Sequence, residues 1–291
     1  MLQCPVPVAA VSAPPTPVIE AIGLTKRYGT APGARPAVDD LHLCVLPGEV
    51  FGFLGENGAG KTTTIKMLTG LIPPTGGVAR IGGHDVRENP LAAKRLVGYV
   101  PDNPFLYEKL TGGEFMNLMG DLYSVPATPA RAERVRDLLR LFDLEAKIDA
   151  PVGGYSRGMR QKIALAAALL HDPKALFLDE PTVGLDPKAT RLLQDVLKAV
   201  AARGAAVFLS THVLGIAAGL CDRVAILHRG RLAAVGAPAE LTQGGERTLE
   251  EVFLSLTGGA GERDAVARLL LGGGTGDESG AAVTAEAETE H

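Results

Sequence analysis

The sequence has few cysteines, no long apolar run and no block of like charges, and each absence excludes a class of protein. Its three cysteines, Cys4, Cys44 and Cys221, are odd in number and far apart. They are typical of reduced cytosolic thiols rather than of a disulfide framework or a metal site. No stretch reaches the roughly 18 apolar residues of a membrane span. The net charge is −4 without a run of five like charges, so nucleic acid is not the expected main partner.

The two ends of the sequence differ in composition from the part between them. Residues 1–17 are rich in proline and alanine and lack the basic start of a signal peptide, so we expect a disordered leader. Residues 259–291 are rich in glycine, alanine and glutamate, which predicts a flexible acidic tail. We therefore expect the folded domain to span residues 18–258.

Within this domain, short apolar segments alternate with helical ones. Nearly all-apolar segments bounded by turn or helix signals predict strands at 50–55, 95–100, 175–179, 205–211 and 223–228. No strand is expected between 112 and 171, where amphipathic and charged segments predict helices. The alternation indicates an α/β fold with a largely parallel sheet and helices on its faces.

The segment GENGAGKTT at 55–63 satisfies the pattern G-x-x-x-x-G-K-[ST] between a predicted strand and a predicted helix. Its glycines allow a tight turn that aims backbone N–H groups at phosphate oxygens, and the helix dipole favours the same anion. Lys61 can reach the β- and γ-phosphates, and the Thr62 hydroxyl can bind Mg²⁺. The predicted nucleoside-triphosphate site comprises Gly55, Asn57, Gly58, Ala59, Gly60, Lys61, Thr62 and Thr63.

The segment ALFLDEP at 175–181 is an apolar strand that ends in two acidic residues. Asp179 lies at the carboxyl end of this strand, where open α/β sheets bind their ligands, and it can hold Mg²⁺. Strand alternation would point Glu180 the other way, where it can take a proton from the attacking water. The pair predicts hydrolysis of the nucleotide.

The segment YSRGMRQK at 155–162 places three cations at the start of a helix. Ser156 suits this position because its hydroxyl can cap free backbone N–H groups. Arg157, Arg160 and Lys162 do not, since the positive end of the helix dipole disfavours them. An uncompensated local conflict indicates a functional site, and the simplest compensation is a bound anion.

Five ordered segments, GENGAGKTT, YSRGMRQK, LFLDEP, GLDP and STH, resemble the motifs of an ABC transporter nucleotide-binding subunit. The resemblance covers about residues 18–258. It implies a P-loop NTPase fold with a RecA-like, mostly parallel sheet core, an N-terminal antiparallel β region and an α-helical insert at about 102–171. It also implies ATP and Mg²⁺ as cofactors.

The segment YSRGMRQK resembles the signature motif of this family, whose common form is Leu-Ser-Gly-Gly-Gln. The resemblance implies that Ser156 and the backbone N–H of Gly158 contact the γ-phosphate held by a second subunit, in a head-to-tail dimer around two ATP. In a single subunit this helix would lack an anion. Dimer formation would supply one, with Arg157 and Arg160 close to its charge.

Other positions follow from the resemblance one at a time. Tyr28 in LTKRYG falls where the family places an aromatic ring that stacks on adenine. Asp186 in GLDP falls in the loop that links the two nucleotide sites across the dimer. His212 in STH matches the switch histidine, which contacts the γ-phosphate and steadies the water, so Lys61, Glu180 and His212 are the implied catalytic residues.

Two segments depart from the usual family pattern. Asp102 in GYVPDNP stands where the family usually has a glutamine that touches Mg²⁺, and we expect it to be a third metal ligand beside Thr62 and Asp179. In the signature segment, Arg157 replaces a glycine and Met159 replaces the glutamine. This form resembles the branch that pairs with export-type permeases for drugs, lipids, polysaccharides or ions.

The resemblance implies the ATP-hydrolysing motor of an exporter at the inner face of the cell membrane. The complete motifs favour a homodimer, and the segment 102–125 would contact a separate integral membrane permease. One alternative is a soluble ABC-type ATPase that acts on ribosomes or DNA, although the chain has one cradle and no basic patch. Another is a regulatory module that closes on ATP and barely hydrolyses it, which Asp102 would permit.

Overall fold

The computed structural model describes residues 15–29, 33 and 35–258. Most of the expected leader (1–17) and the whole expected tail (259–291) lie outside the described residues. The extent of the folded domain therefore stays a prediction at both ends. Within the described part of the chain, no helix is both long and apolar enough to cross a membrane.

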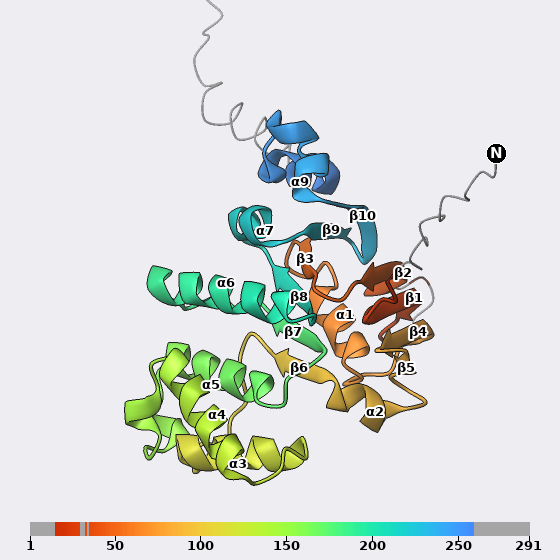
Figure 1. Cartoon of the computed structure of the whole chain (residues 1–291). Coiled ribbons are helices and arrows are strands. Elements are labelled where there is room, and N and C mark those ends of the chain that lie inside the picture. The colour runs from red at the N-terminus through yellow and green to blue at the C-terminus, as the bar shows by residue number, and fades with distance from the viewer. Residues whose placement is uncertain (1–14, 30–32, 34, 259–291) are drawn as a thin grey trace, which may run out of the picture.

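The N-terminal region forms a four-stranded antiparallel sheet, as the resemblance implied (Figure 1). Its strands pair in the order β2-β1-β4-β5. Ile19, Ala21 and Leu24 of β1 are buried against the core, and a register shift between Ala21 and Leu24 interrupts the two-residue alternation of the strand. The bounds are β1 Ile19–Lys26, β2 Val38–Val45, β4 Gly76–Ile81 and β5 His84–Asp85.

The second sheet has six strands in the order β10-β9-β3-β8-β7-β6. All five expected strands are confirmed, and they pair in parallel, whereas β10 pairs antiparallel with β9. Nearly every residue of the central strands is buried, which explains their continuous apolar runs. The bounds are β3 Val50–Gly55, β6 Val97–Val100, β7 Ala175–Asp179, β8 Ala206–Thr211, β9 Arg223–His228 and β10 Arg231–Gly236.

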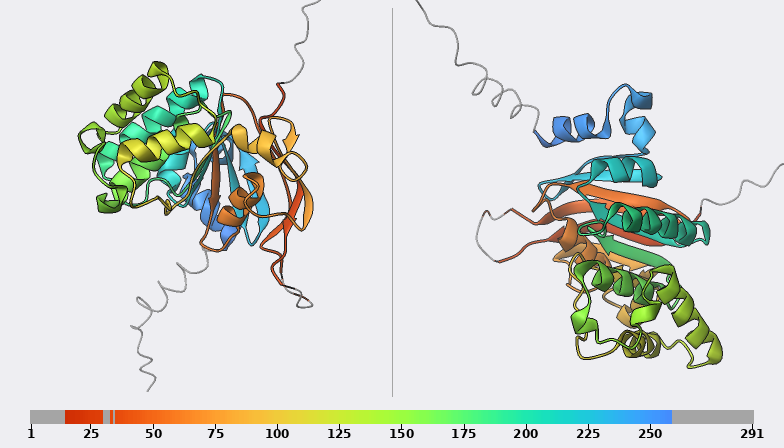
Figure 2. Two further views of the ribbon diagram at one scale, coloured as in Figure 1. Left: turned by 90° about the horizontal axis from the view of Figure 1, so that it is seen from below. Right: turned by 90° about the vertical axis from the view of Figure 1, so that its left-hand side faces the viewer.

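The expected helical insert is confirmed between β6 and β7. It comprises α3 Gly112–Leu122, α4 Pro129–Leu141 and α5 Arg157–Leu169, with 3₁₀ turns at Glu145–Lys147 and Val152–Gly154. Figures 1 and 2 place it at the end of the six-stranded sheet opposite to α9. The other helices are α1 Lys61–Leu68, α2 Pro90–Arg95, α6 Pro187–Ala202, α7 Leu214–Leu220, α8 Pro238–Leu241 and α9 Leu249–Thr257, and a further 3₁₀ turn is Gln243–Gly245.

Two apolar cores lie on the two faces of the six-stranded sheet. Along β7, Leu176 and Leu178 belong to the core that includes the insert, whereas Ala175 and Phe177 belong to the core beneath the antiparallel sheet. The alternation follows from the two-residue period of a strand. The central strands therefore support both cores and hold their carboxyl ends in fixed relative positions.

Candidate nucleotide site

The cradle is the turn between β3 and α1. Gly58 and Gly60 have φ angles of +81° and +112°, a region that glycine adopts without strain. At Gly55, an added Cβ would lie 2.8 Å from the Leu227 carbonyl oxygen, so the neighbouring strand β9 leaves no room for a side chain. These constraints fix the turn from which α1 begins at Lys61.

The Lys61 side chain lies inside the cradle, where it is predicted to bind phosphate. Its side chain is 7% exposed, and Nζ donates hydrogen bonds to the carbonyl oxygens of Gly55 (2.6 Å) and Glu56 (3.3 Å). Nζ also lies 3.4 Å from Oε1 of Glu180. The cation is thus held by oxygen atoms at the start of the helix, where a phosphate would offer stronger acceptors.

Thr62 and Asp179 meet beside the cradle. The Thr62 hydroxyl donates to Oδ2 of Asp179 at 2.8 Å, and the Ser210 hydroxyl of the adjacent strand β8 donates to Oδ1. This set of oxygen atoms fits Mg²⁺, a hard cation that usually takes one or two carboxylates and completes its shell with phosphate and water. Among the described residues, no group of three or more acidic, histidine or cysteine residues could hold a metal ion.

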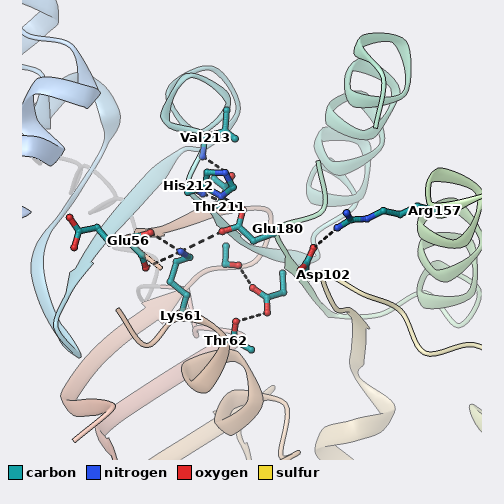
Figure 3. A network of polar contacts seen from close by, with 12 residues as sticks. Glu56, Lys61, Thr62, Asp102, Arg157, Glu180, Thr211, His212 and Val213 are labelled. Carbon is teal, nitrogen blue, oxygen red and sulfur yellow. Dashed lines mark hydrogen bonds and ion pairs between the residues drawn. The ribbon is translucent and has the colours of Figure 1, made fainter. Parts of the chain in front are cut away.

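Glu180 does not follow the strand alternation that the sequence suggested. The strand β7 ends at Asp179, and Glu180 adopts a left-handed conformation with φ of +49°. Both acidic side chains therefore contact residues at the start of α1, Asp179 at Thr62 and Glu180 at Lys61. Oε2 of Glu180 also accepts from His212, at 2.8 Å from Nδ1 and 3.3 Å from the backbone N (Figure 3).

Asp102 lies apart from the predicted metal ligands (Figure 3). Its Oδ1 is 3.2 Å from Nη2 of Arg157, and no contact joins it to Thr62 or Asp179 among the described residues. Its role as a metal ligand stays a prediction, which this geometry does not support. The Asp102 carboxylate is instead paired with a cation of the signature segment.

The prediction that the start of α5 lacks an anion within one subunit is wrong. Arg157 pairs with Asp102, and Arg160 pairs with Glu108 at 3.0 Å. Both carboxylates come from the segment between β6 and α3, which is distant in sequence but close in space. Ser156 caps the helix as expected, since its hydroxyl accepts from the Met159 N–H at 3.3 Å.

Three other predicted residues, Tyr28, Gly158 and Asp186, lie at exposed or partly exposed positions. Tyr28 follows β1 with 57% of its surface exposed, and Nζ of Lys26 lies 5.3 Å from its ring centroid. Asp186 caps α6 by accepting from the Ala189 N–H at 2.8 Å. Gly158 is partly exposed near the start of α5. No contact joins these three residues to the cradle in the part of the chain that the structure describes.

Sequence reasoning missed Ser210 and Glu108. Ser210 precedes His212 in the quoted STH segment, and the pairing of β7 with β8 places it opposite Asp179. Knowledge that β7 and β8 are neighbours in the sheet would have identified Ser210 as the residue beside Asp179. Glu108 carries no local motif, so only the three-dimensional contact with Arg160 reveals it.

Comparison with known proteins agrees with this geometry. The family model described as "ABC transporter" matches residues 38–183. The chain is 39% identical over 226 residues to the Nod factor export ATP-binding protein I of Ralstonia nicotianae, across 78% of this chain and 69% of that protein. The chain belongs to the ABC transporter family. It is an ATP-binding cassette and an ATPase of that family.

Two further similar proteins differ in how much of their own length this chain covers. It is 43% identical over 219 residues to the ATP-binding cassette sub-family A member 7 of Rattus norvegicus, covering 75% of this chain but only 10% of that much longer protein. A solved "ATP binding subunit of ABC transporter" is 35% identical with a TM-score of 0.76, covering 82% of this chain and 99% of that one. The described fold therefore matches nearly the whole of that solved subunit.

Proposed function

We propose that this cassette is the motor of an exporter, which hydrolyses Mg-ATP between two subunits and drives a separate membrane permease. The observation that carries the proposal is the convergence of Lys61, Glu180 and His212 beside the cradle. The export-type form of the signature segment and the similarity to the Nod factor export protein favour export. The cassette would lie at the cytoplasmic face of the membrane.

The contacts assign a distinct task to each residue of the site. Thr62 and Asp179 would hold Mg²⁺, which would neutralise part of the charge of the phosphates. Lys61 would exchange its carbonyl acceptors for phosphate oxygens. That exchange also loosens its contact with Glu180, which would then accept the proton of the attacking water while His212 holds its other oxygen.

The exposed signature segment favours a head-to-tail dimer. Ser156 and Gly158 have no contact with the cradle within the described part of the chain, so their backbone N–H groups are available to a nucleotide bound elsewhere. A second copy in a head-to-tail arrangement would supply that nucleotide, and its own signature would complete the first site. Such an arrangement makes each of the two sites incomplete without the other subunit.

An apolar surface beside the insert suits a membrane partner. A groove of about 470 Å³ lies between α1, α2 and α3 and is lined by Leu71, Leu91 and Leu122, each more than half exposed. Phe105 and Tyr107, in the segment between β6 and α3, are 96% and 57% exposed. Contiguous exposed apolar side chains mark protein interaction sites. The groove and the segment fit the permease contact expected at 102–125.

The first experiment separates closure from hydrolysis. In the Glu180→Gln variant, the amide cannot accept the proton, so we expect an ATP-dependent dimer with hydrolysis reduced by about 10²–10⁴-fold. Size-exclusion chromatography with light scattering and phosphate release measure the two effects. Lys61→Ala is the matched control, and it should lose both dimer and hydrolysis. Wild-type hydrolysis in Glu180→Gln would refute the assignment of the base.

The second measurement identifies the partner. Glu180→Gln protein is incubated with ATP and detergent-solubilised native membranes, and retained proteins are identified by mass spectrometry. Lys61→Ala provides the background. Specific retention of a multi-span membrane protein supports the motor. Retention of soluble partners alone, such as ribosomal proteins, would contradict it and favour a soluble switch.

A further inference from the structure

Two of the residues that depart from the usual family pattern, Asp102 and Arg157, contact each other. Asp102 stands in place of a glutamine and Arg157 in place of a glycine, and their side chains form an ion pair at 3.2 Å across 55 positions of sequence. A glycine at position 157 would leave the Asp102 carboxylate without this cation. We call this ion pair the clasp.

The clasp also touches the loop that precedes α6. The stem of Arg157 packs on Gly184, where an added Cβ would lie 3.1 Å from Cδ of Arg157. Gly184 has a φ of +82° and lies two residues before Asp186, the implied link between the two nucleotide sites. Arg157 therefore lies between the segment after β6 and the loop before α6, at the exposed start of α5.

Arg157 has one guanidinium group. Two anions would compete for it, the Asp102 carboxylate and a nucleotide phosphate. Given the head-to-tail dimer proposed above, on which this inference rests, the start of α5 faces the terminal phosphate of the nucleotide bound by a second copy. That phosphate carries more negative charge than Asp102 and lies closer to the positive end of the α5 dipole. The guanidinium would move from carboxylate to phosphate as the dimer closes.

We propose that Asp102 is a positioning residue that holds Arg157 in the free subunit and releases it to the partner's nucleotide on closure. The clasp thereby raises the ATP concentration at which the dimer forms. The two side chains are 57% and 50% exposed, so the pair is weak. An exposed ion pair typically changes an equilibrium constant by about twofold to fivefold. Salt would reduce this difference, because exposed charges are screened.

The test is a double-mutant cycle in the Glu180→Gln background, in which the ATP-bound dimer accumulates. The ATP concentration that gives half-maximal dimer is measured by light scattering at low salt with saturating Mg²⁺. Asp102→Asn should lower this concentration by about twofold to fivefold, and Arg157→Gly should raise it. Glu145→Gln, which removes another exposed ion pair of the insert, should leave it unchanged.

The decisive comparison is Asp102→Asn on top of Arg157→Gly. If Asp102 acts by holding Arg157, its removal has no further effect once Arg157 is absent. An equal gain in both backgrounds would mean general repulsion between Asp102 and ATP, and would overturn the clasp. A higher ATP or Mg²⁺ requirement in Asp102→Asn would identify Asp102 as a metal ligand and would also overturn it.

The outcomes for the clasp and for the dimer differ. If Glu180→Gln does not dimerise with ATP, the proposed head-to-tail dimer fails, and the clasp fails with it. If Glu180→Gln dimerises and Asp102→Asn has no effect on the ATP requirement, only the clasp fails. Equal thermal unfolding midpoints among the variants ensure that the comparison concerns closure rather than folding.

Discussion

Asp179 is held in place by hydroxyl groups from two different elements. Thr62 at the start of α1 donates to one carboxylate oxygen, and Ser210 at the end of β8 donates to the other. Ser210 is fully buried, so its hydroxyl has a fixed orientation. If Thr62 turned to a bound metal ion, Ser210 would still orient the Asp179 carboxylate. Residues that orient metal ligands in this way strongly affect metal affinity.

Ser210→Ala should therefore weaken metal binding more than folding. We expect the Mg²⁺ concentration for half-maximal ATP hydrolysis to rise about tenfold, because Asp179 loses its fixed donor. A titration of phosphate release against Mg²⁺ measures this change. Ser255→Ala, which removes a hydroxyl on α9 far from the site, is the control. An unchanged Mg²⁺ requirement in Ser210→Ala would contradict this role.

Residue-level patterns predicted the position of the turn before α1, because its geometry is local. The cradle turn is determined by its own glycines and by the helix that follows, so the sequence was sufficient to locate it. The orientation of Glu180 was not predictable, since the rule of alternation holds only inside a strand and β7 ends one residue earlier. The partners of Arg157 and Arg160 were hidden for another reason: they lie more than fifty positions away in sequence.

At the scale of elements, one backbone carbonyl of β6 joins two helices of the insert. The Tyr123 hydroxyl, at the end of α3, and Nε2 of His171, after α5, both contact the carbonyl oxygen of Val97. The two rings stack with centroids 3.7 Å apart. Nδ1 of His171 is buried and has no hydrogen-bond partner among the described residues, and burial lowers the pKa of His171 to about 4. The helices are thus attached to the sheet edge by a neutral histidine.

This attachment should weaken in mild acid. The folded-state pKa of His171 lies below its ordinary value of 6.5, so its contribution to the free energy of unfolding is present above pH 6.5 and is lost as the pH falls toward 4. His171→Phe keeps the ring and removes the titration. We expect its free energy of unfolding, measured in urea at pH 7.5 and pH 5, to fall less than that of the wild type. Tyr123→Phe retains the histidine and should keep the wild-type pH dependence; equal falls in all three proteins would exclude His171 as the cause.

Elements were predictable from the sequence in proportion to their burial. The buried strands β3, β7, β8 and β9 read as continuous apolar runs and were located within a residue. The edge strand β10 alternates between exposed and half-buried residues and was not predicted from the residues themselves. The antiparallel sheet rested on the family resemblance alone, because strand pairing over long sequence distances leaves little local signal.

At the scale of the whole molecule, the two cores share one set of strands. Leu139 of α4 belongs to the core with the insert, and Ile65 of α1 belongs to the core beneath the antiparallel sheet. Both are fully buried. The strands β7 and β8 contribute alternate residues to both cores. If one core unpacked, one face of these strands would become exposed, and the strands would then support the other core less well.

Leu139→Ala and Ile65→Ala should therefore lower one common unfolding transition. Each deletion of a buried side chain is expected to cost about 2–5 kcal/mol of unfolding free energy. Urea denaturation followed by circular dichroism measures the transition. Leu141→Ala, on the same helix but 45% exposed, should have a much smaller effect. A separate early transition in Leu139→Ala would mean that the insert unfolds independently.

The insert leaves the sheet after β6 and returns at β7, and these two strands are hydrogen-bonded neighbours at the sheet edge. The two ends of the insert therefore lie side by side, as they would if the insert replaced a single loop between β6 and β7. Graft sites of this kind tolerate exchange, because the host fold needs only two adjacent ends joined. A chimera that carries the insert of another cassette on this sheet would keep the cradle and the pair Asp179 and Glu180, and would acquire the foreign signature segment and contact surface. The choice of membrane partner would then be transferred with the insert, independently of the cradle and the strands that carry it.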